Sequence, residues 1–120
     1  MRVVRTAEMA ETPADSPLFV GGEVTRQAVV PTEEAKNFNC GIVNFTRGSR
    51  NKFHAHTSDQ ILIITSGIGI VATENEEREV TVGDIVHIPA GEKHWHGARK
   101  ESYMSHITVT SKDSETTTLE

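Results

Sequence analysis

Two histidines separated by one residue, His54-Ala55-His56, most constrain how this chain can fold. Residues at this spacing point apart on an α-helix, whereas on a β-strand they point to the same face. Both imidazoles can therefore bind one metal ion if the segment is a strand. Gln60 follows at the same parity and leads into the apolar run Ile61-Leu62-Ile63-Ile64. The segment predicts strands that carry a candidate metal site on one face.

The composition predicts a small, single-domain protein. The chain has 120 residues, of which 36% are hydrophobic, so its core is modest and we expect a homodimer to bury more of it. A net charge of −5 argues against a nucleic-acid partner, which requires a clustered basic surface. The sequence contains no apolar run of about 18 residues, so it predicts no membrane-spanning helix.

The N-terminus and the cysteine content indicate the compartment. Met1-Arg2-Val3-Val4-Arg5 lacks the apolar centre of a signal peptide, and the single cysteine, Cys40, cannot form an internal disulfide. We therefore expect a cytoplasmic protein. Cys40 begins an apolar strand pattern, which favours burial as a small hydrophobic side chain over a reactive thiol.

The order of apolar runs and turn residues predicts an all-β chain. We expect a short edge strand at 2–5, a strand within 19–30, and another over 39–46. Further strands are expected near 52–57, 60–66, 68–74, 78–82, 85–89, 94–98 and 103–110. Short strands at this spacing favour a closed barrel or sandwich without βαβ crossovers. Residues 1–38 would pack on the barrel or on a dimer partner, 39–110 would form the barrel, and 111–120 would be a flexible polar tail.

Two glycine-framed blocks contain the histidines. In the first, five residues separate Gly48 from His54, three residues separate His56 from Gln60, and six residues separate Gln60 from Gly67. In the second, five residues separate Gly83 from Pro89-Ala90-Gly91, and two more residues separate Gly91 from His94.

Over residues 39–110 these blocks resemble the cupin superfamily, which implies a jelly-roll-like antiparallel β-barrel, commonly dimeric, with one divalent metal inside. Two positions depart from the usual pattern: Gln60 replaces a glutamate and Ala98 replaces an asparagine. Carried over by position, the resemblance implies His54, His56, Gln60 and His94 as metal ligands.

Ligand chemistry agrees with a metal site but does not fix the ion. Imidazole suits first-row divalent metals; manganese is our first expectation, with Fe, Ni, Zn and Co as alternatives. The alternative for the histidines is hydrogen bonding in the fold without a metal, and the alternative for Gln60 is a strand position beside three protein ligands. A neutral Gln60 would leave the full +2 charge on the ion, which suits polarising or proton-transfer chemistry.

The runs Gly91–Ala98 and Met104–Ile107 further resemble a cupin subfamily that includes manganese-dependent hydroxynitrile lyases, which also use three His and one Gln. Two additional active-site histidines of that subfamily match His96 and His106, which are therefore candidate catalytic residues. A threonine that serves their site falls at Asn51 here, a departure from the lyase pattern. Uronate-processing cupins share the same ligand set, so the ligands alone do not define the reaction.

The leading hypothesis is a metal-dependent lyase or isomerase that acts on a small carbonyl or hydroxy compound, with His106 or His96 moving a proton. The alternatives are a metal-dependent oxygenase or an isomerase of a small organic acid, and a non-catalytic module that binds a metal or small ligand. Arg47, Arg50 and Lys52 precede the histidine strand and could steer an anionic substrate, although a solvated loop explains them as well.

Overall fold

Twelve strands and one short 3-10 turn form the fold in the computed structural model, which describes all residues from 1 to 120. The N-terminal elements are the turn η1 (Thr6–Glu8) and the strands β1 (Thr12–Pro13), β2 (Phe19–Val20), β3 (Val24–Val30), β4 (Phe38–Phe45), β5 (Arg50–Asn51) and β6 (His54–His56). The remaining strands are β7 (Gln60–Thr73), β8 (Glu77–Thr81), β9 (Ile85–Ile88), β10 (His94–Ala98), β11 (Met104–Ser111) and β12 (Thr116–Thr118). No helix is long and apolar enough to cross a membrane.

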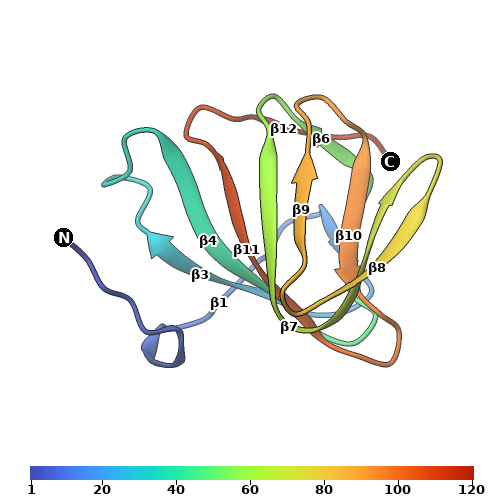
Figure 1. Ribbon diagram of the computed structural model, residues 1–120, viewed down its shortest axis with the longest axis horizontal. Coiled ribbons are helices and arrows are strands. Elements are labelled where there is room, and N and C mark those ends of the chain that lie inside the picture. Colours follow the sequence, from blue (N-terminus) through green and yellow to red (C-terminus); the bar gives the residue numbers. More distant parts are fainter.

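The strands pair antiparallel in the order β1-β3-β4-β11-β7-β10-β5-β2, with β8 and β9 also on β7, and β6 between β10 and β12. The 14-residue β7 connects the two halves of the sheet. Its first half pairs with β9 and β11, and its second half pairs with β8 and β10. The sheet therefore curls around a common interior (Figure 1), which confirms the predicted all-β barrel.

Glycines make two boundaries differ from the prediction. The two strands expected at 60–66 and 68–74 are one strand, Gln60–Thr73, because Gly67 (φ 75°) accommodates an irregularity and does not end β7. Opposite Gly67 the register of β11 shifts between Ser105 and His106, and a Cβ at Gly67 would collide with the Tyr103 carbonyl. Conversely, Gly21 and Gly22 both have positive φ and divide the segment expected at 19–30 into β2 and β3.

The structure differs from the prediction at both ends of the chain. The expected strand at 2–5 does not form; these residues carry no strand pairing, and Arg2 instead forms an exposed ion pair with Glu34. The C-terminal segment is not a loose tail, because Thr116–Thr118 forms β12 and pairs with the histidine strand β6. The three β-branched threonines suit a strand, and they cover an edge of β6 that would otherwise be unpaired.

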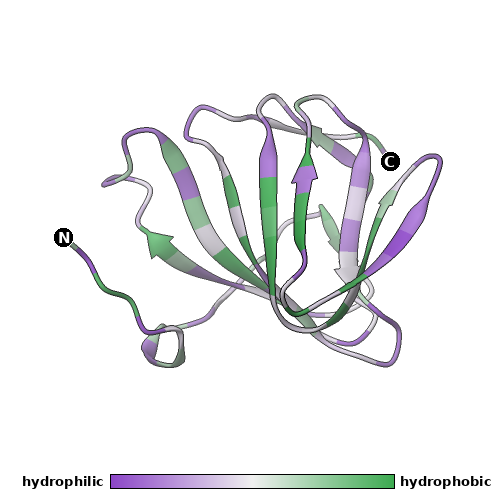
Figure 2. Cartoon of the chain, in the orientation of Figure 1, coloured by the Kyte–Doolittle hydropathy of each residue, from purple (hydrophilic) through white to green (hydrophobic).

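The apolar core occupies one part of the interior. Seven buried side chains form it: Val24, Val43, Phe45, Ile64, Val80, Ala98 and Met104. Hydrophobic positions run through β4, β7 and β9, while the loops between the strands are mainly polar (Figure 2). The chain therefore closes one part of the barrel with apolar side chains and leaves the rest of the interior to polar ones.

Candidate metal centre

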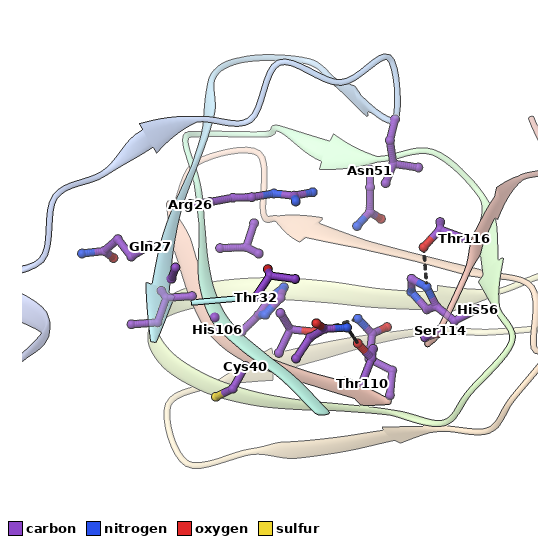
Figure 3. A pocket seen from close by; sticks show the side chains of 18 of the residues that line it. Arg26, Gln27, Thr32, Cys40, Asn51, His56, His106, Thr110, Ser114 and Thr116 are labelled. Atoms are coloured by element: carbon purple, nitrogen blue, oxygen red, sulfur yellow. Dashed lines mark hydrogen bonds between the residues drawn. The ribbon is translucent and has the colours of Figure 1, made fainter. Parts of the chain in front are cut away.

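A cavity of about 490 Å³ lies in the barrel interior beside the apolar core. Its walls come from both halves of the sheet, and labelled residues from β3, β4, β5, β6 and β11 surround it in Figure 3. The cavity lies within the size range of small-molecule sites. His54, His56, Gln60, His96 and His106 are among its lining residues. The fold thus gathers five of the six predicted site residues around one space.

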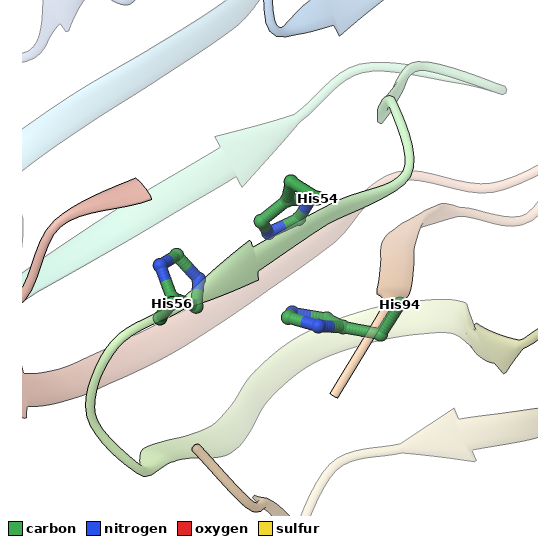
Figure 4. A group of neighbouring side chains, drawn as sticks. All are labelled: His54, His56 and His94. Carbon is green, nitrogen blue, oxygen red and sulfur yellow. The ribbon is translucent and has the colours of Figure 1, made fainter. Parts of the chain in front are cut away.

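The predicted histidine triad comes together in the structure. His54 and His56 project from β6 and His94 faces them from β10, so that the three rings converge (Figure 4). Their candidate ligand atoms all lie within 4.8 Å of one another. His54 and His94 are directly paired in the sheet, which explains how residues forty positions apart meet. The three histidines could hold one metal ion.

Two of the rings are oriented by backbone carbonyls. His54 Nδ1 donates to the Lys52 carbonyl at 2.6 Å, and His94 Nδ1 donates to the Glu92 carbonyl at 2.8 Å. Because a carbonyl only accepts, both Nδ1 atoms carry the proton and both Nε2 atoms keep a free lone pair. This arrangement presents Nε2 as the ligand atom and fixes the direction of the ring.

The third ring is oriented by the C-terminal strand. His56 Nδ1 lies 2.9 Å from Thr116 Oγ1, the contact drawn as a dashed line in Figure 3. His56 Nε2 is buried and has no hydrogen-bond partner. Buried polar atoms nearly always find a partner, so an unpaired ring nitrogen facing two other imidazoles fits a metal ligand. The donor set therefore passes this test for a divalent transition metal.

Gln60 lies beside the triad with its amide held in one orientation. Its Nε2 donates to Thr108 Oγ1 at 2.9 Å, which leaves Oε1 on the other side, 3.2 Å from His94 Nε2. The residue is only 5% exposed. The structure thus places a neutral oxygen beside the three imidazoles, where the sequence predicted a fourth ligand.

The histidines are neutral at pH 7. Burial lowers the pKa of His54 and of His56 to about 4, and it also lowers the pKa of His94. The desolvated interior disfavours the charged imidazolium, and neighbouring rings add like-charge repulsion for His54 and His56. A neutral imidazole is the form that binds a metal, so the environment favours the ligand state of these side chains.

His96 and His106 form a second, fully buried pair next to the triad. His106 Nε2 lies 3.2 Å from His96 Nδ1, and the two rings are 3% and 0% exposed for His96 and His106 respectively. Burial lowers the pKa of His106 to about 4 and the pKa of His96 well below its ordinary value. His106 Nδ1 is buried without a hydrogen-bond partner. The predicted catalytic pair is therefore in contact and neutral.

Asn51 orients His96. Its Oδ1 accepts the His96 backbone N–H at 2.8 Å, which directs Nδ2 to the ring, 3.2 Å from Nε2. The same amide nitrogen lies 3.4 Å from Nδ1, so the shorter distance favours Nε2 as the acceptor, with the Nδ1 proton directed toward His106. The residue that departs from the lyase pattern thus makes a direct polar contact with one of the catalytic candidates.

The basic loop residues do not line the cavity. Arg50 forms an ion pair with Glu120 at 3.1 Å, and its guanidinium carbon lies 4.6 Å from the Trp95 ring centroid. Arg47 is exposed, and Lys52 contributes its carbonyl to His54. Cys40 is a half-buried free thiol whose pKa is raised by desolvation. These side-chain contacts therefore favour the alternative of a solvated loop over a steering role.

Two contributors were missed at the sequence level. Thr116 orients His56 from a segment predicted to be loose, and nothing in its threonine-rich sequence identifies that partner. Arg26 lines the cavity from β3, on the same strand face as Val24 and Ala28. The alternation of that strand was the signal that could have placed Arg26 inside.

The comparisons with known proteins agree with this fold. The model of the cupin domain family matches residues 41–110, so the chain belongs to the cupin family. It is 40% identical over 68 residues to an (R)-mandelonitrile lyase from Granulicella tundricola, an alignment that spans 56% of this chain and 52% of that protein. The chain thus matches about half the length of this relative.

Solved structures share the whole fold. A cupin-like protein from Thermotoga maritima is 30% identical, with a TM-score of 0.82 over 93% of this chain and 87% of that one. The polyketide cyclase RemF from Streptomyces resistomycificus has a TM-score of 0.89 over 100% of this chain and 86% of that one, at 16% identity. The second likeness concerns the fold alone.

Proposed function

We propose that the protein is a metal-dependent lyase that cleaves a small hydroxy compound, or performs related proton-transfer chemistry on a carbonyl compound. One observation carries this proposal: three buried imidazoles with oriented Nδ1 atoms converge beside a cavity that also holds a buried pair of histidines. His54, His56 and His94, with Gln60 as a fourth, would hold one divalent ion, with manganese as the leading choice. When bound, this ion would supply Lewis-acid polarisation of a substrate oxygen.

The proton chemistry falls to the buried pair. In a hydroxynitrile cleavage the hydroxyl proton is removed, the C–C bond breaks, and its electron pair leaves with cyanide, which then takes up a proton. His96 Nε2 would accept the proton in place of its hydrogen bond from Asn51, and the His96 imidazolium would then be stabilised by His106 Nε2, which accepts from His96 Nδ1. Their lowered pKa values make the protonated pair a strong acid, which suits return of the proton to the leaving group.

The relative supports C–C cleavage as the first reaction to examine, because its name records mandelonitrile as a substrate. Asn51 stands where the lyase subfamily carries threonine, and its amide reaches the His96 ring. An amide is a stronger fixed donor than a freely rotating hydroxyl, so Asn51 holds His96 in one tautomer. We expect this difference to change the rate or the preferred substrate while the reaction class stays the same.

The test is cleavage of (R)-mandelonitrile by manganese-loaded protein, followed through benzaldehyde release with and without oxygen. The proposal predicts equal turnover in both atmospheres, and a loss of about 100-fold or more in His106→Asn. His87→Asn is the matched control, because His87 is exposed and pairs with Asp59 away from the cavity. Oxygen-dependent turnover would favour the oxygenase, and an unaffected His106→Asn would favour a binding module.

We also propose that the protein forms a homodimer through the outer face of the sheet. Ile63 on β7 is registered with Ile107 on β11 and with Ile85 on β9, and Ile85 is 67% exposed. These side chains lie opposite in parity to the cavity-lining ones, so a second copy would bury them. Light scattering should give twice the chain mass for the wild type and the monomer mass for Ile85→Glu; a monomeric wild type would refute the dimer.

A further inference from the structure

Arg26 has no ionic partner although it lines the cavity. It lies on the inner face of β3, registered with the buried Val43 of β4, and its guanidinium carbon lies 5.5 Å from the Phe19 ring centroid. None of the five ion pairs in the molecule involves Arg26. Figure 3 shows its side chain extending from β3 across the cavity, toward the side on which Asn51 and His56 lie.

The cavity lining around Arg26 contains no acidic side chain. The chain has 17 acidic residues, but no aspartate or glutamate is among the 23 residues that line the cavity. Arg26 is also the only lysine or arginine there. The remaining polar groups of the lining are amides, hydroxyls, imidazoles and the Cys40 thiol. In a protein with net charge −5, an acid-free cavity with one unpaired guanidinium attracts an anion.

We propose that Arg26 binds the carboxylate of a small 2-hydroxy or 2-oxo acid, and that this carboxylate defines the substrate class of the cavity. A planar guanidinium matches a carboxylate through two parallel hydrogen bonds. The Phe19 ring supports the guanidinium from one side and leaves its N–H edge for the ligand. The exposed position of Arg26 allows a ligand from solvent to reach it.

The proposal gives the two parts of the cavity separate tasks. The acid's carboxylate lies at Arg26, and its hydroxyl or carbonyl group extends toward the histidines. The inference rests on the proposed function for the reaction at the histidine end. The carboxylate contact at Arg26 can be tested independently of that reaction. It also predicts that an uncharged cyanohydrin leaves Arg26 without a partner and is bound less well than a hydroxy acid of similar size.

The test compares binding of two acids and their amides by isothermal titration calorimetry. Lactate and mandelate are the probes, and lactamide and mandelamide are neutral matches of the same shape. In manganese-loaded wild type we expect each acid to bind more tightly than its amide. Arg26→Gln should weaken the binding of both acids by about tenfold or more and leave the amides within about twofold. Arg26→Lys keeps the charge but not the paired hydrogen bonds, so its affinity for the acids should lie between those of the wild type and Arg26→Gln.

Arg47→Gln is the matched control, because it removes one positive charge from an exposed position outside the cavity lining. It should bind both acids as the wild type does. The inference is overturned if Arg26→Gln binds the acids unchanged, if Arg47→Gln loses as much affinity, or if neither acid binds the wild type.

Elemental analysis of the same samples separates the inference from the proposed function. Metal bound at one ion per chain with no effect of Arg26→Gln overturns the carboxylate site and leaves the metal centre intact. An effect of Arg26→Gln in protein that takes up no metal supports the carboxylate site and overturns the metal-dependent lyase.

Discussion

The same strands build an apolar core at one end of the barrel and a polar cavity at the other. β7 supplies Ile64 to the core and Gln60 to the cavity, and β11 supplies Met104 to the core and His106 to the cavity. Seven of the eight buried polar residues surround or line the cavity: Gln27, Asn51, His54, Gln60, His94, His96 and His106. Burial of polar groups costs free energy unless they are paired, and apolar side chains at these positions would stabilise the fold more. The difference is consistent with the proposal that the polar part binds a metal and a small ligand.

The largest effect on stability should come from the apolar part. Ile64 is 2% exposed, so Ile64→Ala should lower the free energy of unfolding by about 2–5 kcal/mol. Metal stoichiometry should stay at the wild-type value, because Ile64 contributes no ligand. Denaturant unfolding and elemental analysis of the same preparation measure both quantities. Val82→Ala, at a 60% exposed position, is the control and should cost less than about 0.5 kcal/mol.

The polar part should make metal-free protein sensitive to acid. The folded-state pKa values of His54 and His106 are lowered to about 4, whereas the unfolded chain takes up these protons near the ordinary value of 6.5. Below pH 6.5 the unfolded state binds more protons, so stability falls with pH down to about 4. Each such histidine contributes a slope of about 1.4 kcal/mol per pH unit. Unfolding curves that stay constant between pH 6.5 and 5 would contradict the buried neutral histidines.

The smallest predicted effect concerns the charge of the centre. Gln60→Glu should retain the metal, since a carboxylate oxygen is also a ligand, but it removes one positive charge from the site. Binding of lactate should weaken by about threefold to tenfold, while lactamide changes less. Asn75→Asp is the control, because it adds the same single negative charge at an exposed position between β7 and β8, outside the cavity lining. Tighter lactate binding in Gln60→Glu would contradict this electrostatic account.

The sequence predicted the polar part better than the chain ends. Strand parity predicted that His54 and His56 share a face, and the resemblance of the two glycine-framed blocks to cupins added Gln60 and His94. The same kind of resemblance named His96 and His106, and the structure shows that their rings are in contact. The merging of 60–66 with 68–74 could not be anticipated, because Gly67 permits a turn and a bulge equally well.

The features that the sequence did not predict depend on pairing between segments distant in the chain. Thr116–Thr118 has the composition of a solvated tail, and only the exposed edge of β6 in three dimensions makes it a strand. The segment 2–5 has strand-like residues but no strand pairing. Arg26 is one of many charged residues in the sequence, and its position becomes informative only once the acid-free lining is known. In each case the deciding information is a neighbour distant in sequence.

The most direct test of the central claim is the metal content of protein purified without added chelator, measured by elemental analysis. The account predicts about one divalent transition-metal ion per chain in the wild type and in His87→Ala, and a loss of the ion in His54→Ala. Circular dichroism should show that His54→Ala retains its strands. A wild type without metal that also fails to take up manganese, or a His54→Ala variant with unchanged stoichiometry, would contradict the assignment of the three histidines as a metal centre.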